Sequence, residues 1–408
     1  MELLNHAVIV LSGLFTGLML YQGGLFLAAC LKTRKKNTAG SYRRFALVAS
    51  ARNEENVIGH LIDSLKAQNY PKEAFDIFII ADNCTDATGE RAADKGALVY
   101  YRHDLGNIGK GYALGWFFKQ FMPSLGQNYD AIGIFDADNL VDKDFLRCMN
   151  DKLSAGASAV MGYRDSKNPY DSWVSGCMSM GFWGVADMYY QPHDRFGLTC
   201  IAGGTGYVFK TELIKDGWNT QTICEDAEFT IQLAARGHAI AYEPKARFYD
   251  EQPVDFKTSA RQRLRWAVGG YQNMKVGLPL LFRSLKTQSP ALILDSVIYM
   301  LMLPAFALNM LFPLFNLAFQ LLLPPAMRGA DLVQLMLLPV MGLLGLFFQG
   351  GFILLLARRF SPRLLKSLFM YPFFMFTTGI INVAAVFTPK LSWRPIEHKR
   401  SVGIGQME

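Results

Sequence analysis

Long apolar segments flank a polar middle in this chain. Four of them contain no charged residue: residues 7–31, 296–327, 332–357 and 367–389. Each reaches or exceeds the roughly 20 residues with which an α-helix crosses the hydrocarbon core of a bilayer. Residues 41–290 instead alternate short apolar runs with amphipathic stretches. Because that alternation is typical of an α/β domain with a mainly parallel sheet, the pattern predicts such a domain together with α-helical transmembrane segments.

The same pattern divides the chain into four parts. Residues 1–40 form an N-terminal transmembrane anchor and a basic linker, and residues 41–255 form the α/β domain. An amphipathic region at the membrane surface follows at residues 256–290, and a C-terminal transmembrane region with a basic tail fills residues 291–408. A chain of 408 residues is long enough for a catalytic domain with a large core and a membrane part.

The charges around the first apolar segment predict its orientation. Four basic residues follow it: Lys32, Arg34, Lys35 and Lys36. Residues 1–6 lack the positive charge with which a secretory signal begins, so a membrane anchor is favoured over a cleaved signal. Because Lys and Arg stay on the cytoplasmic side, we expect a multi-pass protein of the cell membrane whose N-terminus lies outside and whose polar domain is cytoplasmic.

The basic C-terminal tail conflicts with a simple count of crossings. Its charged residues include Lys390, Arg394, Lys399 and Arg400. Three crossings after the domain would place this tail outside, against the positive-inside rule. We therefore predict a cytoplasmic tail. An interfacial or re-entrant piece within residues 296–327, which Pro304 and Pro313 interrupt, would change the count.

Polar residues follow the predicted strands of the middle domain. The strands are expected at residues 45–50, 76–82, 97–101 and 131–136. A helix is expected over residues 54–71, with Glu54 and Glu55 at its positive end and Pro71 closing it. Ligands of such sheets bind beyond the carboxyl ends of the strands. The polar residues at or just past these ends are Asn53, Asp82, Asp136 and Asp138.

Asp136 and Asp138 are separated by a single residue at one of these ends. Two such carboxylates can hold Mg²⁺ or Mn²⁺ and stay ionised, with substrate phosphates completing the coordination shell. A turn in which the Asp and Asn side chains cap the following helix explains the pair at least as well. The motif by itself therefore leaves both interpretations open.

Composition argues against several other classes of protein. The six cysteines show neither pairing nor metal-ligand spacing and the six histidines are scattered, so we interpret both as structural. The net charge of +7 gathers beside apolar segments, which favours membrane lipids over nucleic acid as partners. A Walker loop around Lys110 is rejected because Asp104 and Gly111 stand where Gly and Ser or Thr are required. The GGTG stretch misses a dinucleotide fingerprint at Phe209.

Seven short motifs occur in an order that resembles one enzyme family. They are ARNEE (51–55), ADNCTDAT (81–88), GKGYAL (109–114), DADN (136–139), GGTG (203–206), CEDAEF (224–229) and QRLRW (262–266). Over residues 41–290 the chain resembles the membrane-embedded processive glycosyltransferases of family 2, which include cellulose, chitin, hyaluronan and poly-N-acetylglucosamine synthases. The resemblance implies a cytosolic GT-A-like α/β domain that acts on a UDP-sugar donor with Mg²⁺ or Mn²⁺.

The resemblance also implies roles for the donor site. Asp82 would contact the base or ribose, Asp136 the nucleotide, and Asp138, with Asp136, the metal on the diphosphate. Asn53, Lys110 and Arg265 would complete the nucleotide-sugar site, because a guanidinium can clamp a diphosphate with its planar donors.

The remaining motifs would serve the acceptor and the chemistry. Asp226 matches the general base, with Glu225 beside it, although Cys224 replaces the threonine of the family's T-E-D motif. The acceptor-binding residues would be Gly204, Thr205, Gln262 and Trp266. In physical terms, the Trp266 ring can lie against the sugar that accepts the next unit.

Two of these motifs have simpler explanations. QRLRW can belong to an interfacial helix, running to Leu285, whose Arg261, Arg263, Arg265 and Trp266 lie at lipid headgroups. This explanation is compatible with catalysis. CEDAEF can be an ordinary acidic helix start, which the helix dipole favours.

The function that these expectations favour is an inverting, processive β-glycosyltransferase. It would transfer sugar from a UDP-sugar to a growing polysaccharide or oligosaccharide at the membrane and help to export the product. The alternative is a nonprocessive enzyme that glycosylates a lipid such as ceramide or diacylglycerol. A noncatalytic sugar-polymer transporter or sensor would not need the metal carboxylates, the base and the diphosphate arginine together.

Overall fold

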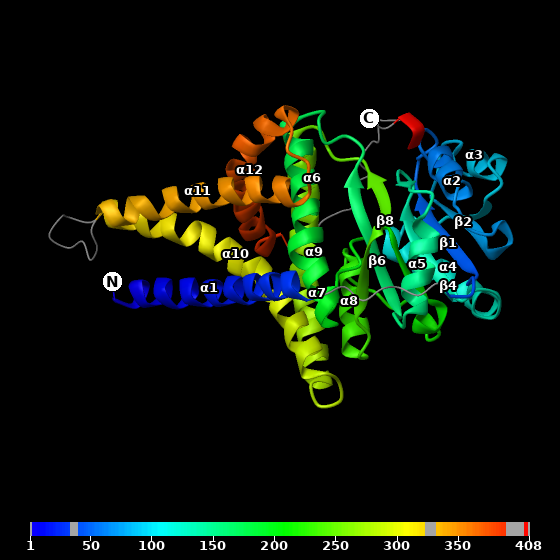
Figure 1. Ribbon diagram of the computed structural model, residues 1–408, viewed down its shortest axis with the longest axis horizontal. Coiled ribbons are helices and arrows are strands. Elements are labelled where there is room, and N and C mark those ends of the chain that lie inside the picture. The colour runs from blue at the N-terminus through cyan, green and yellow to red at the C-terminus, as the bar shows by residue number, and fades with distance from the viewer. Residues whose placement is uncertain (1, 33–39, 323–331, 389–403, 407–408) are drawn as a thin grey trace.

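A mixed α/β domain lies at one end of the molecule, and long apolar helices project from it at the other (Figure 1). The structure is a computed structural model, and it describes residues 2–32, 40–322, 332–388 and 404–406. The N-terminus lies at the far end of the projecting helices, and the described C-terminal residues lie beside the α/β domain.

The domain is built on one eight-stranded sheet with the order β3-β2-β1-β4-β7-β6-β8-β5. The strands are β1 (Phe45–Ala51), β2 (Phe75–Asp82), β3 (Leu98–Arg102), β4 (Ala131–Asp136), β5 (Leu140–Val141), β6 (Ala159–Ser166), β7 (Tyr207–Lys210) and β8 (Ile240–Asp250). The first four pair in parallel. The second half is mixed, because β7 runs antiparallel to both β4 and β6, and β5 runs antiparallel to β8. The sheet is therefore mixed, although four of its seven strand pairings, including that of β6 with β8, are parallel.

The four strands expected from the apolar runs are confirmed, but the first expected helix is shorter. The helices and short turns of the domain are α2 (Ile58–Lys66), η1 (Lys72–Ala74), α3 (Thr88–Asp94), α4 (Lys110–Asn128), α5 (Phe145–Ser154), α6 (Trp173–Val185), η2 (Ala186–Tyr190), α7 (Gln191–Phe196), η3 (Thr211–Ile214) and α8 (Glu225–Ala235). Glu54 and Glu55 precede α2 and bind the start of α3 instead. The Glu54 N–H donates to Thr88 Oγ1, and Glu55 Oε2 accepts from the Ala87 N–H. Hydrogen bonds to the start of α3 thus take the place of the expected contact between these glutamates and the positive end of α2.

A long helix, α9 (Phe256–Ser284), connects the domain to the apolar helices. Asp255 caps it by accepting a hydrogen bond from the Thr258 N–H at 2.8 Å, as expected of an N-cap aspartate. The helix carries the QRLRW motif and ends just before Leu285, and its place at the membrane surface stays a prediction.

In the described part of the chain, four helices are long and apolar enough to cross a membrane. They belong to α1 (Glu2–Leu31), α10 (Pro290–Leu322), α11 (Leu332–Leu356) and α12 (Leu365–Val386). The helix α10 is continuous through Pro304 and Pro313, so the expected interruption there is wrong. The basic tail at residues 390–400 lies outside the described residues.

The C-terminal helices share the hydrophobic core of the α/β domain. Ile353 and Leu354 of α11, and Leu368, Tyr371 and Phe374 of α12, belong to the same buried cluster as the central strands. The apolar helices therefore form a continuous packed unit with the domain.

Gly206 shows how tightly the strand edge is packed. Its φ of 66° is left-handed, and a Cβ atom placed on it would lie 2.0 Å from the Phe248 ring. Only glycine combines this backbone angle with so close a neighbour.

Gly206→Ala is expected to destabilise the domain more than Gly197→Ala. Both glycines are left-handed, but no atom lies within 4 Å of a Cβ on Gly197. The control therefore carries only the backbone strain of about 1–2 kcal/mol, whereas Gly206→Ala adds overpacking of about 1–3 kcal/mol. Thermal unfolding in detergent would measure the difference, and equal losses would contradict the packing argument.

Candidate active site

The chain turns sharply after β1 and after β2, and an asparagine stands at each turn. Asn53 and Asn83 have φ values of 57° and 55°, which asparagine tolerates better than most residues. Asn53 Oδ1 accepts hydrogen bonds from the N–H and the hydroxyl of Thr85. Asn83 donates to Asp82 Oδ1 at 2.9 Å and accepts from the Asp104 N–H at 2.8 Å. The side chains after neighbouring strands thus hold one another in place.

Asp82 forms a buried ion pair with Arg102 at this edge. Their Oδ1 and Nη1 atoms are 2.6 Å apart, and both side chains are almost fully buried. Burial raises the pKa of Asp82, and the Arg102 contact opposes the rise. No sequence motif indicated Arg102, although Asp82 and Arg102 are register partners at the ends of β2 and β3.

Asp136 is the last residue of β4, and two side chains hold its backbone N–H. Its N–H lies 2.9 Å from Thr205 Oγ1 and 3.1 Å from Asn139 Oδ1, and the Thr205 hydroxyl donates to the same Asn139 oxygen. Thr205 is fully buried. Its side chain therefore positions the Asp136 strand end, and this burial does not fit the expected acceptor contact.

Lys110 joins the acidic strand end to the glycine loop. It is the first residue of α4, and its ammonium group pairs with Asp136 Oδ1 and donates to the Gly204 carbonyl at 2.8 Å. Gly204 has a φ of 83°, and a Cβ atom there would lie 3.5 Å from Asp226 Oδ2. The structure thus brings Lys110, Asp136, Gly204 and Asp226 together.

Asp138 is buried beside Asp136 and is held on both sides. Its Oδ2 atom accepts from the Glu251 N–H at 3.2 Å, and Lys167 donates to its backbone carbonyl. No cluster of three His, Cys, Asp or Glu side chains that could hold a metal occurs in the residues that the structure describes. Two carboxylates nevertheless fit Mg²⁺ or Mn²⁺ when substrate phosphates supply further oxygen ligands, and the Asp136 side chain is 40% exposed for such an approach.

Arg164 and Asp250 extend the site in a way that no sequence motif indicated. The Arg164 guanidinium donates to the Gly203 carbonyl and lies 3.4 Å from an Asp250 carboxylate oxygen. The pKa of Asp250 is raised to about 7. Burial is the largest cause and the charges of Asp138 and Asp136 add to it, whereas Arg164 lowers the pKa. Asp250 therefore belongs to the same electrostatic cluster as the DADN motif.

Glu225 and Asp226 begin α8, where the positive end of the helix dipole favours carboxylates. Burial raises the pKa of Glu225 to about 7, with the Asp226 charge as the second cause. Burial also raises the pKa of Asp226, while the Lys110, Arg164 and Arg265 charges lower it. The pair therefore retains a proton at a higher pH than free carboxyl groups do.

The QRLRW residues reach the same site from α9. The Trp266 ring meets the Phe182 ring edge-on with 6.1 Å between centroids, and the Arg164 guanidinium lies over the same Phe182 ring at 4.5 Å from its centroid. Gln262 Oε1 is buried and has no hydrogen-bond partner in the described structure. A buried acceptor without a donor is costly, so a ligand hydroxyl that donates to Gln262 would be favoured.

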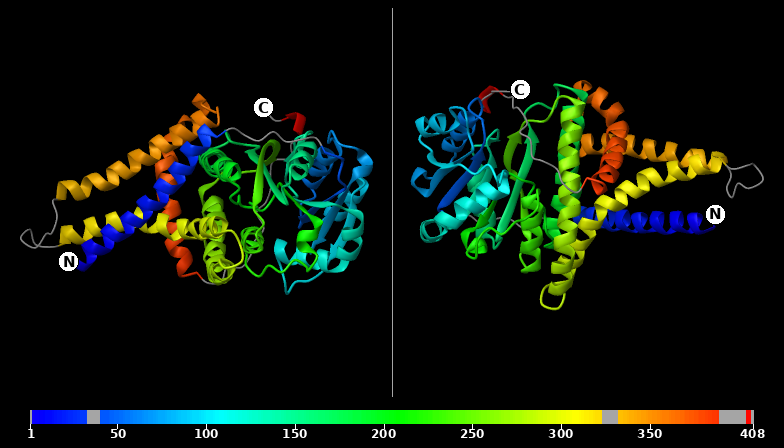
Figure 2. Two further views of the ribbon diagram at one scale, coloured as in Figure 1. Left: turned by 60° about the horizontal axis from the view of Figure 1, so that its bottom comes forward. Right: turned by 180° about the vertical axis from the view of Figure 1, so that it is seen from behind.

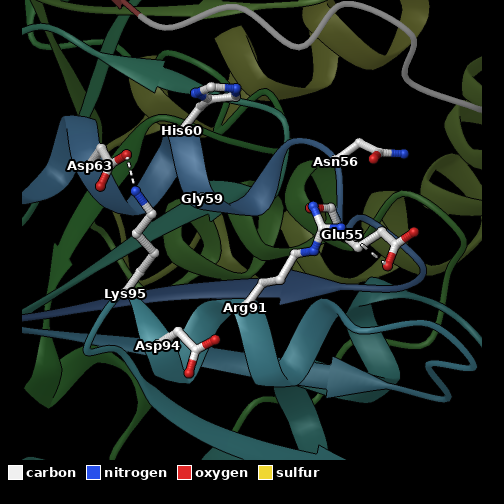
Figure 3. A pocket seen from close by; sticks show the side chains of 8 residues that line it. All are labelled: Glu55, Asn56, Gly59, His60, Asp63, Arg91, Asp94 and Lys95. Atoms are coloured by element: carbon white, nitrogen blue, oxygen red, sulfur yellow. Dashed lines mark hydrogen bonds and ion pairs between the residues drawn. The ribbon is translucent and has the colours of Figure 1, made fainter.

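A separate surface hollow lies between α2 and α3 (Figure 3). It is lined by Glu55, Asn56, Gly59, His60, Asp63, Arg91, Asp94 and Lys95. Lys95 and Asp63 form an ion pair of 2.6 Å across it. None of the candidate site residues lines this hollow, so it is distinct from the active site.

The raised pKa of Asp226 predicts an acid limb of activity at higher pH than a free aspartate would give. If Asp226 must be ionised to accept a proton, transfer should rise with pH above the usual titration range of an aspartate, because burial raises the pKa of this group. Glu225→Gln removes the neighbouring carboxylate, so the limb should move to lower pH. Initial rates between pH 5 and 9 would test both expectations, and an acid limb that stays in place in Glu225→Gln would contradict the coupling of the pair.

Comparison with known proteins shows similarities in sequence and in fold. A sequence model described as glycosyltransferase like family 2 matches residues 43–269. A β-monoglucosyldiacylglycerol synthase from Synechocystis is 28% identical over 57% of this chain and 48% of its own length. A poly-β-1,6-N-acetyl-D-glucosamine synthase from Staphylococcus aureus is 28% identical over 58% of this chain and 56% of its own length. The chain thus spans about half the length of these curated relatives.

One solved structure has a similar fold over nearly the whole chain. The mannosyltransferase PcManGT from Pyrobaculum calidifontis, in complex with GDP-Man and Mn²⁺, aligns with 95% of this chain and 98% of its own. The TM-score is 0.61 at 18% sequence identity. This likeness shows the fold, a GT-A-like arrangement with a mixed sheet.

Proposed function

Because the chain belongs to the glycosyltransferase-like family 2, we propose that it transfers a sugar from a nucleotide sugar to the hydroxyl group of a membrane lipid. The cell membrane is its proposed location, with the α/β domain in the cytoplasm. The donor is a UDP-sugar, as the motifs imply. The two relatives named above carry activities toward a lipid and toward a polymer, so their names do not separate the two acceptors.

The position of the active-site carboxylates next to apolar helices supports a lipid as the acceptor. Asp226 and Trp266 stand on α8 and α9, which pack directly on α10. A Cβ atom on Gly270 of α9 would lie 2.8 Å from Leu303 of α10. Tyr299 of α10 packs against the hydrophobic core of the α/β domain. An acceptor held by its apolar part in the bilayer would therefore meet the base where these helices join the domain.

The described helices give less support to polymer export. Only 6% of the residues in the apolar window of α1, and 22% in that of α11, are buried. Each of these helices contacts α10, and Figures 1 and 2 show all three projecting from the α/β domain. A polymer channel needs enclosing walls, so the geometry favours a lipid acceptor over the processive synthesis that the sequence motifs suggested.

The proposed chemistry assigns one task to each group. The acceptor hydroxyl attacks the anomeric carbon, the bond from that carbon to the diphosphate breaks, and Asp226 takes the hydroxyl proton. Lys110 and Arg265 hold the leaving diphosphate, and Trp266 and Gln262 orient the acceptor. Attack from the side opposite the diphosphate inverts the anomeric centre and gives a β-linkage from an α-linked donor.

Asp136 and Asp138 would hold the divalent cation through carboxylate oxygens. Bound Mg²⁺ or Mn²⁺ supplies positive charge that stabilises the departing diphosphate. The Mn²⁺ and nucleotide sugar bound to PcManGT support this assignment. In the donor site, the Asp82–Arg102 pair would lie beside the base, and Asn53 would shape the loop around it.

The experiment is a transfer assay with labelled donors. Purified protein in vesicles that contain diacylglycerol or ceramide is given UDP-glucose, UDP-galactose, UDP-N-acetylglucosamine or GDP-mannose, with and without Mn²⁺. We expect metal-dependent label in solvent-extractable lipid with a UDP-sugar. Label in an insoluble polymer that linkage-specific glycosidases release would overturn the lipid acceptor, and no transfer from any donor would favour a transporter or sensor.

A further inference from the structure

The helix α12 has the length and composition of a membrane crossing, but its contacts place it elsewhere. It packs against α9 and α6, which belong to the catalytic end of the molecule, as well as against α10 and α11. A crossing helix must leave that end within its own length. The contacts at the beginning, middle and end of α12 show whether it does.

The beginning of α12 is fixed to the α/β domain. The Cys177 thiol of α6 donates to the Ser367 carbonyl at 3.3 Å. Just before the helix, Arg359 forms an ion pair with the buried Asp165 of β6, and the Arg363 guanidinium lies over the Tyr170 ring at 5.5 Å. The connection from α11 to α12 therefore lies on the catalytic side of the membrane.

The middle of α12 is held by Arg263, one residue of the QRLRW motif. The Nη1 atom of this buried arginine donates to the Phe374 carbonyl at 3.1 Å and to the hydroxyls of Thr377 and Thr378 at 3.0 and 2.7 Å. The guanidinium also lies 4.0 Å from the Phe374 ring centroid. Arg263 is two residues from Arg265, so the middle of α12 lies at the level of the active site.

The end of α12 also lies at the level of the active site. Ala385, one residue before the helix ends, is buried against Ala267 and Val268 of α9. At the other end of this contact, Phe373 packs on Phe256 with 6.1 Å between ring centroids. The two helices therefore run side by side in the same direction from residue 373 to residue 385, next to the active-site part of α9.

The views agree with these contacts. In Figures 1 and 2, α12 runs beside α9 and α6 and across the direction of α1 and α11. Its outer side is apolar and exposed at Leu365, Phe369, Phe373, Ile380 and Phe387. This surface continues the exposed apolar residues of α1, α10 and α11, which identifies lipid as its occupant. The cationic side chains of Arg358 and Arg363 before α12, and of Lys366 in its first turn, suit the headgroup region.

We propose that α12 lies in the plane of the membrane, in the leaflet next to the catalytic domain, with its outer apolar stripe in contact with lipid. Only α1, α10 and α11 then cross the bilayer, so an N-terminus outside places the C-terminal tail on the catalytic side. The short η6 turn (Ile404–Gln406) lies beside the α/β domain in every view, in agreement with this side. The inference rests on the membrane location in the proposed function and not on the acceptor.

Depth-dependent quenching of a fluorescent label tests the orientation directly. Leu365→Cys, Phe373→Cys and Phe387→Cys are labelled in a background without the six native cysteines, in vesicles with quenchers at known depths. An in-plane helix gives one depth for all three labels. A crossing helix would place residue 373 within about 5 Å of the bilayer centre and the other two about 16 Å from it, and that result would overturn the proposal. Leu344→Cys and Leu355→Cys on α11 are the matched control, with an expected difference of about 16 Å.

A reporter on the unsubstituted chain gives an independent measurement. A fluorescent protein that folds only in the cytoplasm and a phosphatase active only outside are each fused after Glu408. Fluorescence without phosphatase activity is expected, and phosphatase activity alone would overturn the three-crossing topology. If the cysteine-free protein does not fold, the reporter fusions on the unsubstituted chain still test the three-crossing topology. Both readouts are independent of sugar transfer, so a wrong acceptor assignment would leave them unchanged.

Discussion

Replacing Asp226 by asparagine is expected to reduce sugar transfer by about 10² to 10⁴ while leaving nucleotide binding near normal. A sugar or lipid hydroxyl is a very weak acid, so the attacking oxygen needs a carboxylate that takes its proton as the new bond forms. Asparagine keeps the shape of the side chain and removes that base. The nucleotide is held by other groups in this account, namely Asp82, Asp136, Lys110 and Arg265, so its affinity should change little.

The control for this variant is Glu228→Gln in the same first turn of α8. Glu228 accepts hydrogen bonds from the N–H groups of Gln221 and Thr222 at 2.8 and 2.7 Å, so it shapes the preceding loop rather than the reacting centre. Glutamine can still accept these bonds. Label incorporation and calorimetric UDP binding would be measured on the same preparations. Wild-type transfer by Asp226→Asn would remove Asp226 from the mechanism and point to Glu225.

Asp138→Asn is expected to weaken metal-dependent UDP binding by at least roughly tenfold, because even residues outside the first coordination shell cost about 10- to 100-fold in metal affinity. Asparagine can still accept the hydrogen bond from the Glu251 N–H, so the fold should be retained. Calorimetry with UDP, with and without Mn²⁺, measures the loss without relying on activity.

Asp144→Asn supplies the matched control for the metal prediction. Asp144 precedes α5 and accepts a hydrogen bond from Asn69 at 2.9 Å, away from the DADN motif. Its replacement should leave the Mn²⁺ effect unchanged. If Asp138→Asn also leaves the effect unchanged, the two aspartates would be assigned to capping the turn, the interpretation that the sequence alone left open.

The strand ends were predictable because apolar runs and the polar residues after them follow from local sequence. The parallel order of β3, β2, β1 and β4 brings Asn53, Asp82 and Asp136 to one edge. Arg102 could have been predicted from the register of β2 and β3. Arg164 and Asp250 could not, because the antiparallel β7 separates β4 from β6, and no local pattern indicates that insertion.

Two other features depend on tertiary contacts that hydropathy does not contain. The glycine-rich stretch around Thr205 is typical of an exposed loop, but Thr205 is buried beneath Asp136. The apolar run of α12 has the composition of a crossing helix, and only its contacts with Arg263 and Ala267 place it beside α9. Composition reports that a helix prefers lipid, whereas its direction is set by the neighbours on which it packs.

The size of the product distinguishes a lipid acceptor from a growing polysaccharide. Wild-type protein in vesicles that contain diacylglycerol or ceramide is given the donor that supports transfer in the panel assay, in small excess over enzyme, and all products are weighed by mass spectrometry. We expect acceptor lipid that carries a single sugar, with the amount of product growing in time while its mass stays constant. Long chains present from the earliest time points, while most acceptor remains unmodified, would contradict it and establish processive polymer synthesis.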